Sequence, residues 1–504
     1  MNSSNLLARN ARKYPLTEAI VSMGKRISYQ ELDLFVTKFA HALRQQGLQE
    51  GDRIVLFMPN VLEFVISYFA VQRIGAIVVP INAKFSLREV EFVMTHSEAA
   101  CIIAHEMLFP VVAPLKCGTA KIKTGSAANG WLGMEELMAV ADSTTISCQL
   151  AEDDLSTILY TSGTTGDPKG VLFSYRNILT VAHMIAVEME VKPESRMLLM
   201  MPLSHSAPLH LFMMAAFVVG CTSVLTPTFT PDLLIDSVVN ERTTHFFGAP
   251  VAYLLTAQNP RLAEANLSSM KWWVYGGAPL SKNEVLMLSK KFNTNRLVSV
   301  YGLTEAGPSG SLLHAEEHPH KAGSIGCRAP LGTELRLVDE EGHDVPNGEI
   351  GEIVLYGEGN MQGYYKNEEA TVAAFIDGWL RTGDLARMDE DGYLWIVDRK
   401  KDVIISGGIT IYPKEIEEML LQFNGIAEAA VIGIPHAEWG ETVKAVFSAS
   451  TAIEVEMLKK FLQENLADYK VPRIFEQVDS LPRNASGKIL KQQLKGGVVN
   501  EGVS

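Results

Sequence analysis

Residues 160–171 read Tyr-Thr-Ser-Gly-Thr-Thr-Gly-Asp-Pro-Lys-Gly-Val, and this stretch decides how the rest of the chain is interpreted. Its three glycines allow the backbone to approach a polyanion closely. Hydroxyl groups and one ammonium group add hydrogen-bond donors and positive charge, from Thr161, Ser162, Thr164, Thr165 and Lys169. The pattern predicts a phosphate-binding loop, but it lacks the Gly-Lys-Ser/Thr ending of a Walker A motif, so a P-loop ATPase fold does not follow. The loop by itself leaves open a solvated turn between a strand and a helix.

The composition describes a large globular protein without a nucleic-acid or membrane signature. A chain of 504 residues with 47% hydrophobic content can bury a large core and is expected to contain more than one domain. The formal charge of -14 argues against nucleic acid or an anionic membrane as a partner. Five scattered cysteines without a CxxC pair are typical of a reducing compartment. The chain starts without an apolar signal segment and its longest apolar run, Leu211 to Val219, is too short for a membrane span, so we expect a cytoplasmic protein.

Local signals predict an α/β fold in the first part of the chain. Ser28 with Glu31 and Ser86 with Glu89 form two capping-box patterns, each of which opens an amphipathic helix. Short apolar strands alternate with such helices, which is typical of parallel sheets covered by helices on both faces. Strands are expected at residues 157–160, 197–201, 222–225, 244–248, 272–275 and 297–301. Residues 119–149, rich in Gly, Ser, Ala and Thr, are expected to form an irregular surface connection.

The pattern changes twice in the second part of the chain. Glycine-punctuated short strands from Ala322 to Val397 predict a β-rich subdomain. Beyond residue 401, two helices and two strands predict a small α+β domain of ordinary size. We therefore expect a large domain of layered α/β sheets with a β-rich subdomain, residues 1–400, and a small mobile α+β domain, residues 401–504.

Seven further motifs follow the phosphate-binding loop in a fixed order. They are residues 202–205, Gly276-Gly277-Ala278-Pro279, Tyr301-Gly302-Leu303-Thr304-Glu305, residues 381–384, residues 398–402, residues 406–408 and residues 482–488. Together with the loop, they resemble the signatures of the adenylate-forming enzymes, the superfamily of acyl-CoA synthetases, peptide-synthetase adenylation domains and luciferases. The chain is most similar in this respect to an acyl-CoA synthetase. The resemblance spans nearly the whole chain and implies ATP, Mg²⁺ and CoA as co-substrates and cofactor.

The chemistry of such a reaction explains why these residue types would be needed. A thiol cannot attack a carboxylate directly, because the negative charge repels it and oxide does not leave. Attack of the carboxylate on the α-phosphorus of ATP gives an acyl adenylate and pyrophosphate, and AMP then leaves when the CoA thiol arrives. The first step gathers roughly five negative charges, so catalysis consists of neutralising and orienting them.

The resemblance implies a role for each motif residue. The catalytic residues would be Lys488, the adenylation lysine; Thr304, near the α-phosphate; and His205, which would gate the acyl pocket. Mg²⁺ would be held by Glu305 and Thr161. The phosphates would lie against Ser162, Gly163, Thr164, Thr165 and Lys169, and the adenine against Gly276, Gly277, Ala278, Pro279, Tyr301 and Gly302. Asp384 and Arg399 would bind the ribose end, Lys401 would be the hinge of the small domain, and Gly407 and Gly408 would line the pantetheine path.

Each of these residues also has an ordinary structural interpretation. Lys488 lies in a polar tail, Asp384 occupies a common turn position, and Glu305 could be a solvated or helix-capping acid. A single histidine beside apolar residues, such as His205, is more often a satisfied core group. Thr410 stands where the family commonly has Asn, which puts the fine positioning of that loop in doubt.

The acid substrate is less well defined by the sequence. Candidate pocket walls are residues 206–214, 246–251, 273–277 and 302–308, which contain no Lys or Arg to pair with a second carboxylate. The first three walls also contain no Asp or Glu to meet the ammonium group of an amino acid. An unbranched medium- or long-chain fatty acid is the preferred prediction, with an aromatic acid as the nearest alternative. Acyl loading of a carrier protein and a catalytically silent nucleotide-binding protein are further alternatives, and a homodimer is compatible with the sequence.

Overall fold

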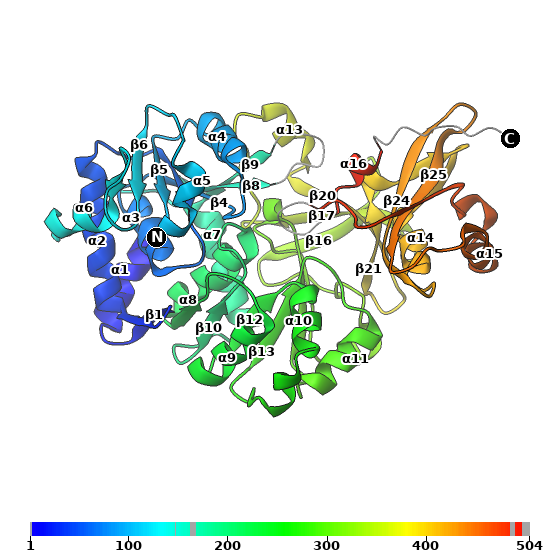
Figure 1. Ribbon diagram of the computed structural model, residues 1–504, viewed down its shortest axis with the longest axis horizontal. Coiled ribbons are helices and arrows are strands. Elements are labelled where there is room, and N and C mark those ends of the chain that lie inside the picture. The colour runs from blue at the N-terminus through cyan, green and yellow to red at the C-terminus, as the bar shows by residue number, and fades with distance from the viewer. Residues whose placement is uncertain (1–2, 147, 162–167, 484–488, 496–504) are drawn as a thin grey trace. The chain divides into compact units, whose positions relative to one another are not determined.

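The computed structural model of the protein describes residues 3–146, 148–161, 168–483 and 489–495 (Figure 1). The described residues form two compact units. The larger unit contains residues up to 161, 168–335 and 354–380, and the smaller unit contains residues 336–353 and the residues from 381 onward. The α/β fold class is confirmed, because helices and strands alternate through the larger unit and the smaller unit combines a sheet with helices.

The first sheet of the larger unit has eight strands in the order β15-β14-β13-β12-β10-β11-β1-β2. In that order the bounds are Ser311–Leu313, Leu297–Tyr301, Trp272–Gly276, His245–Gly248, Arg196–Leu199, Thr222–Leu225, Glu18–Ser22 and Lys25–Ser28. The strands from β14 to β1 are parallel to their neighbours, and both edge strands are antiparallel. Parallel strands place their carboxyl ends at one edge of the sheet, so the motifs after β10, β13 and β14 lie at that edge.

Helices cover both faces of this sheet. On one face the cluster of buried side chains joins β10, β12 and β13 to α9 (Pro231–Glu241), α10 (Pro250–Ala257) and α11 (Lys282–Lys291), which Figure 1 shows beside one another. Trp273 and Tyr275 of β13 point into this cluster. Strand β10 also contacts the π-helical turn η2 (Ala207–Met213), which packs with α7 (Tyr175–Glu188) and α8 (Met214–Val219), and α1 (Ser3–Lys13) packs on α8.

The second sheet of the larger unit also has eight strands, in the order β18-β9-β8-β4-β3-β5-β6-β7. In that order the bounds are Gly363–Tyr364, Lys169–Ser174, Leu155–Thr161, Ile77–Ile81, Arg53–Phe57, Cys101–Ala104, Ala120–Lys123 and Leu132–Gly133. The accompanying helices are α2 (Tyr29–Gln45), α3 (Leu62–Arg73), α4 (Leu87–His96), α5 (Phe109–Val112) and α6 (Met134–Val140). Because α3 is apolar on nearly every side, its residues from Phe64 to Arg73 are all buried.

The expected irregular connection at residues 119–149 is wrong. Strand β6 forms there and pairs in parallel with β5, and β7 and α6 follow it. The sequence Ala-Lys-Ile-Lys has no strong strand preference of its own. Its backbone is ordered by the open edge of β5, a tertiary effect that overrides local propensity.

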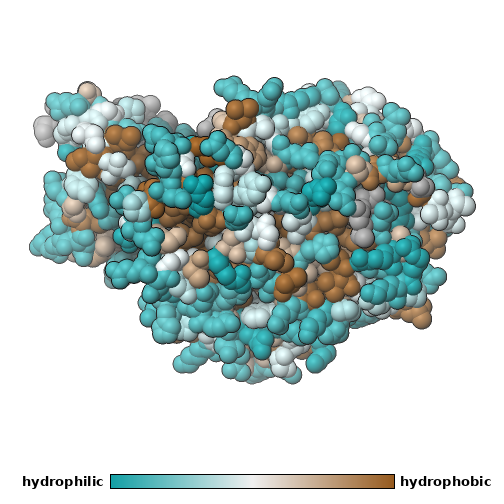
Figure 2. All heavy atoms as spheres, turned by 180° about the vertical axis from the view of Figure 1, so that it is seen from behind, coloured by the Kyte–Doolittle hydropathy of each residue, from teal (hydrophilic) through white to brown (hydrophobic). Residues whose placement is uncertain are grey.

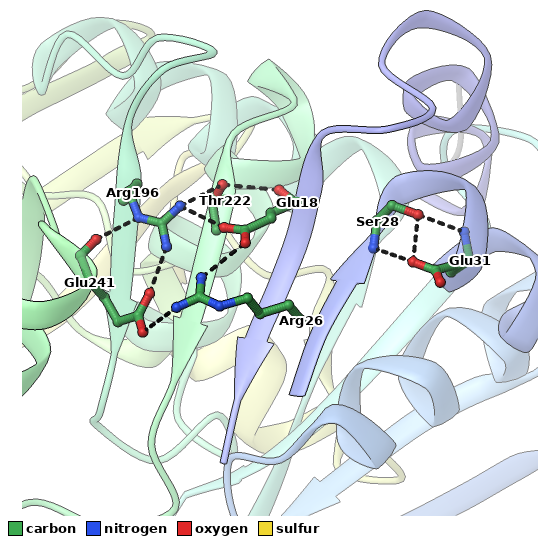
Figure 3. A network of polar contacts seen from close by, with 7 residues as sticks. All are labelled: Glu18, Arg26, Ser28, Glu31, Arg196, Thr222 and Glu241. Carbon is green, nitrogen blue, oxygen red and sulfur yellow. Dashed lines mark hydrogen bonds and ion pairs between the residues drawn. The ribbon is translucent and has the colours of Figure 1, made fainter. Parts of the chain in front are cut away.

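A charge network lies at the amino ends of β1 and β10 in the first sheet. Arg26 and Arg196 each donate to both Glu18 and Glu241 at 2.7–2.9 Å, which closes a ring of four charges across β1, β2, β10 and α9 (Figure 3). Partial burial opposes ionisation of Glu18, but the hydrogen bonds and charges of Arg196 and Arg26 outweigh it and lower the pKa of this carboxyl. The predicted capping box at the start of α2 is confirmed beside the network.

The β-rich stretch expected between residues 322 and 397 is confirmed. It forms a sheet in the order β16-β17-β20-β19 with β21 beside β20, and the bounds are Thr333–Val338, Ile350–Gly357, Trp379–Met388, Phe375–Ile376 and Leu394–Arg399. The later sheet of the smaller unit has the order β23-β22-β25-β24 with β26 beside β25, and its bounds are Ile409–Ile411, Ile404–Ser406, Gly440–Ala449, Ile426–His436 and Ile474–Val478. Helices α14 (Pro413–Leu420), α15 (Val455–Asn465) and α16 (Lys491–Leu494) accompany it.

The surface is a mixture of polar and apolar side chains. Figure 2 shows hydrophilic residues over most of the visible face, with separate apolar areas between them. Single exposed apolar side chains are normal for a folded protein and identify no partner. Within the described ranges, no helix has the length and the apolar content that crossing a bilayer requires.

Candidate active site

The two described ends of the predicted phosphate-binding motif belong to an antiparallel pair of strands. Strand β8 ends at Thr161, strand β9 begins at Lys169, and these two residues pair across the hairpin. The Thr161 hydroxyl donates to the Lys169 carbonyl oxygen at 3.5 Å, a long and weak contact. Ser162, Gly163, Thr164 and Thr165 lie outside the described residues. Thr161 and Lys169, the described residues on either side of that gap, are therefore held by strand pairing.

Tyr364 connects this hairpin to the acidic motif residue Glu305. Strand β18 adds to β9 as an edge strand and places Tyr364 opposite Val171. The Tyr364 hydroxyl donates to Glu305 Oε1 at 2.9 Å, and Lys169 Nζ lies 4.9 Å from the centroid of the Tyr364 ring. Burial, together with the charge of the Glu305 carboxylate and the hydrogen bond to it, raises the pKa of Tyr364, so the phenol keeps its proton. Tyr364 is not among the residues predicted from the sequence, where its only signal is its place in the stretch Gly363-Tyr364-Tyr365.

The strands β13 and β14 bring two glycine-containing motifs together. Gly276 pairs with Val300, and a Cβ atom on Gly276 would lie 2.6 Å from the Val300 carbonyl oxygen. The backbones therefore approach more closely than any side chain permits. Gly277 has a φ of +85° and open space around it, so its requirement for glycine is conformational. Ala278 and Pro279 follow on the exposed surface beside the strand end.

The segment from Tyr301 to Glu305 turns sharply where β14 ends. A Cβ atom on Gly302 would lie 2.4 Å from the Pro308 carbonyl oxygen, so only glycine allows this turn. Thr304 and Glu305 belong to a short 3₁₀ turn, η4 (Thr304–Ala306). The Ser206 hydroxyl donates to Thr304 Oγ1 at 3.3 Å. These contacts fix the start of the turn, on which Thr304 and Glu305 are presented at the carboxyl edge of the sheet.

His205 lies beside the same edge. It follows β10 and its Nε2 atom is 3.4 Å from Nδ2 of Asn82. Burial lowers the pKa of His205, so the ring is neutral at pH 7 and accepts from the Asn82 amide. The predicted catalytic residues Thr304 and His205 thus lie on adjoining loops, linked through Ser206, whereas Lys488 lies outside the described residues.

The smaller unit carries the remaining motif residues. Asp384 of β20 pairs with Arg399 of β21, and Arg399 Nε lies 2.5 Å from Asp384 Oδ1. Asp384 is 3% exposed, whereas Arg399 is half-exposed, so the pair presents its guanidinium to solvent. Lys401 follows on an exposed 3₁₀ turn, η5 (Lys400–Asp402).

The two glycines at 407 and 408 form the tight turn between β22 and β23. Their φ values are +58° and +82°, and no atom lies within 4 Å of the Cβ position of Gly408. The amide of Gly407 donates to the Trp439 carbonyl at 2.9 Å, and the Arg473 guanidinium lies 3.3 Å from the centroid of the Trp439 ring. The turn is therefore open on the Gly408 side and bordered by an aromatic and a cationic group that the sequence analysis did not identify.

These features describe an α/β protein with several motif residues at the carboxyl edge of one sheet, and comparison with known proteins identifies its family. Residues 7–365 match the model of the AMP-binding enzymes, and residues 415–488 match the model of the AMP-binding enzyme C-terminal domain. The chain belongs to the family of AMP-binding enzymes. The resemblance to adenylate-forming enzymes is thereby confirmed.

Several similar proteins are CoA ligases. A feruloyl-CoA synthase from Amycolatopsis sp is 35% identical, and the long-chain-fatty-acid–CoA ligase FadD13 of Mycobacterium tuberculosis is 33% identical; in both cases the match covers 97% of each chain. The crystal structure of ATP-bound MatB from Rhodopseudomonas palustris superposes with a TM-score of 0.88 at 31% identity and 98% coverage of both chains. ATP, Mg²⁺ and CoA, which the sequence analysis expects, are the co-substrates and cofactor of AMP-forming CoA ligases.

Proposed function

We propose that the chain activates an apolar monocarboxylic acid, with unbranched medium- or long-chain fatty acids as the first substrate class. The carboxylate oxygen attacks the α-phosphorus of ATP, the bond to the β,γ-phosphates breaks, and acyl adenylate and pyrophosphate result. The CoA sulfur then attacks the acyl carbon, AMP leaves, and the thiol proton is released. Membership of the AMP-binding enzymes supports the reaction, and the similarity to FadD13 supports the acid class.

The observation that carries the acid class is an aromatic pair beside the carboxyl edge of the first sheet, in wall stretches without a Lys or Arg side chain. Phe212 of η2 stacks on Phe247 of β12, with ring centroids 5.0 Å apart and an interplanar angle of 20°. Phe247 also lies against Gly276, where a Cβ atom would be 3.1 Å from its ring. The wall stretches contain no Lys or Arg. A second carboxylate placed there would be desolvated without a counter-charge, which disfavours dicarboxylic acids.

The oxygen donors at Glu305 and Thr161 fit Mg²⁺. This cation prefers carboxylate, hydroxyl and phosphate oxygens, and it usually takes only one or two protein carboxylates when substrate phosphates supply the rest. Bound Mg²⁺ would neutralise phosphate charge. Lys169, Ser162, Gly163, Thr164 and Thr165 would bind and orient the same phosphates.

The other motif residues are assigned by the same proposal. Thr304 would contact the α-phosphate and neutral His205 would border the acid, while Tyr301, Gly302 and residues 276–279 would surround the adenine. Asp384 would accept from the ribose hydroxyls, with Arg399 holding its carboxylate in place. Lys488 would serve the adenylation step and Gly407 and Gly408 the thioester step. A small domain from residue 401 that turns about Lys401 would present these two sets of groups in succession.

An aromatic acid is the second candidate. The stacked rings of Phe212 and Phe247 lie in two of the wall stretches, and an aromatic ligand that stacked against aromatic side chains there would gain free energy beyond simple area burial. The similarity to a feruloyl-CoA synthase points to the same class.

A panel of acids tests the proposal by pyrophosphate release with and without CoA. Octanoate, dodecanoate and palmitate represent the first class, ferulate and benzoate the second, and malonate and phenylalanine serve as controls. We expect release with the fatty acids, weaker release with the aromatic acids, and CoA-dependent AMP formation in the purified protein. Highest turnover with malonate, or no release with any acid, would overturn the proposal. AMP formation that requires a carrier protein instead of CoA would reassign the acceptor.

A further inference from the structure

The acidic and basic groups assigned above to Mg²⁺ and to the phosphates contact the same aromatic side chain. Glu305 accepts from the Tyr364 hydroxyl, and Lys169 lies over the Tyr364 ring. These two charges are opposite in sign and belong to neighbouring segments. Without a group between them, an ammonium and a carboxylate at a partly buried site attract each other strongly, because less water screens their charges. An ion pair between them would occupy both of the groups that the nucleotide and its metal need.

The backbone around Tyr364 is held on two sides, so the ring has a defined position. Strand β18 pairs with β9, and the amide of Tyr364 donates to Thr371 Oγ1 at 2.9 Å. Since Tyr364 is opposite Val171, Lys169 is its diagonal neighbour on the same face of the antiparallel pair, within reach of an aromatic ring. The cation–π contact therefore follows from strand register.

Glu305 is held from two directions as well. Its carbonyl oxygen accepts from the Met361 amide at 2.7 Å, just before β18, while its carboxylate accepts from Tyr364. The turn that carries Glu305 is thus docked on the segment that carries Tyr364. In the described structure Glu305 and Lys169 form no ion pair with each other, and each instead contacts a different part of the same tyrosine.

We propose, on the basis of the function proposed above, that Tyr364 is a positioning residue that keeps Lys169 and Glu305 apart and aims them at the phosphates and at Mg²⁺. Its hydroxyl orients the Glu305 carboxylate by a charge-assisted hydrogen bond. Its ring holds the Lys169 ammonium by a contact that is weaker than an ion pair and is readily given up to a phosphate. The tyrosine touches neither the acid nor the reacting atoms in this assignment, so its effect is exerted through the other two residues.

Two substitutions at Tyr364 separate the hydroxyl from the ring. In Tyr364→Phe, the ring remains over Lys169 and only the hydrogen bond to Glu305 is lost. We expect the Mg²⁺ concentration for half-maximal ATP binding to rise about three- to tenfold, with ATP affinity in EDTA unchanged. In Tyr364→Leu, both contacts are lost and Lys169 can pair with Glu305, so ATP affinity in EDTA should fall as well. Adding Glu305→Gln to Tyr364→Leu should restore the metal-free affinity, because Lys169 is then released.

Tyr365→Phe is the matched control. Tyr365 is the next residue, and its hydroxyl donates to the Ser97 carbonyl at 3.5 Å. This substitution therefore removes a tyrosine hydroxyl that bonds neither Glu305 nor Lys169. Binding is measured by titration calorimetry without acid or CoA, and the unfolding midpoint of each ligand-free variant is measured beside it. Tyr365→Phe should leave the Mg²⁺ requirement unchanged.

The outcomes separate this inference from the proposed function. An unchanged Mg²⁺ requirement in Tyr364→Phe, or an equal rise in Tyr365→Phe, would overturn the role of Tyr364. If Glu305→Gln, added to Tyr364→Leu, did not restore ATP binding in EDTA, the proposal that Tyr364 keeps Lys169 and Glu305 apart would be overturned. The phenylalanine variant decides the role of the hydroxyl even where the leucine variant unfolds. Failure of the proposed function is seen separately, as absence of acid-dependent pyrophosphate release by the wild-type protein.

Discussion

Replacement of Gly276 by Ala tests whether close backbone contact between β13 and β14 builds the nucleotide site. The added methyl group would lie 2.6 Å from the Val300 carbonyl oxygen and 3.1 Å from the Phe247 ring. Carbon–oxygen contacts normally begin at about 3.3 Å, so the overlap is roughly 0.7 Å. A strand backbone inside a sheet cannot rotate away as a flexible side chain could. Overpacking of this kind typically costs about 1–3 kcal/mol of folding free energy.

The displaced strand ends also carry residues 277–279 and 301–305, so ATP affinity should fall together with stability. If ATP binding must first return the displaced strands to their positions, each 1.4 kcal/mol of free energy that this requires lowers the ATP affinity about tenfold. Unfolding in urea, followed by two spectroscopic probes, and ATP titration calorimetry give the two quantities. Gly276→Asn should cost more than Gly276→Ala because its side chain is larger.

The neighbouring glycine supplies the control. Gly277 has a φ of +85° and no atom within 4 Å of its Cβ position, so Gly277→Ala should cost only the penalty for a left-handed residue, roughly 1–2 kcal/mol. Asn tolerates this conformation better than Ala, so Gly277→Asn should be the milder of the two changes. Wild-type stability of Gly276→Ala would contradict a steric role for Gly276. So would the finding that the same substitution, Ala or Asn, is the more destabilising at both positions.

Four further predictions address other parts of the chain. Asp384→Ala removes the carboxylate that lies 2.5 Å from Arg399, and ATP affinity measured by calorimetry should fall about tenfold or more; unchanged affinity would exclude the ribose role. Gly408→Leu places a side chain in open space at a φ of +82°, so pyrophosphate release should persist while thioester formation stops, and intact CoA transfer would contradict the assignment. Lys488→Ala, at a position outside the described residues, should abolish acyl-adenylate formation but leave CoA transfer from supplied acyl adenylate; equal loss of both half-reactions argues against it. Because the pKa of Glu18 is lowered below its ordinary value of 4.5, the folded state binds this proton less readily than the unfolded chain does. The contribution of ionised Glu18 to the free energy of unfolding is complete above about pH 4.5 and is lost as the pH falls. In acid unfolding experiments, the stability of Glu18→Gln should therefore fall less steeply with decreasing pH in this range than that of the wild type.

The motif order predicted the family, and local patterns predicted most elements that carry the motifs. The strands expected at 222–225 and 297–301 have these bounds in the structure, and the capping boxes at Ser28 and Ser86 open helices as expected. Such features depend on neighbouring residues: runs of apolar side chains, and a side chain that satisfies amide groups three residues away. They are therefore readable from the chain itself.

The sequence by itself determined which side chains are available to bind phosphate, metal and ribose, because their chemical groups and the spacing of the motifs are properties of the sequence. Only the tertiary structure decided which of these residues come into contact with one another. The hairpin at Thr161 and Lys169, the docking of Tyr364 on it, and the closeness of Gly276 to Val300 all depend on strand pairing between separate segments. Pairing partners are selected by burial and backbone hydrogen bonding across the whole fold, and these forces leave no local signature at a residue such as Tyr364.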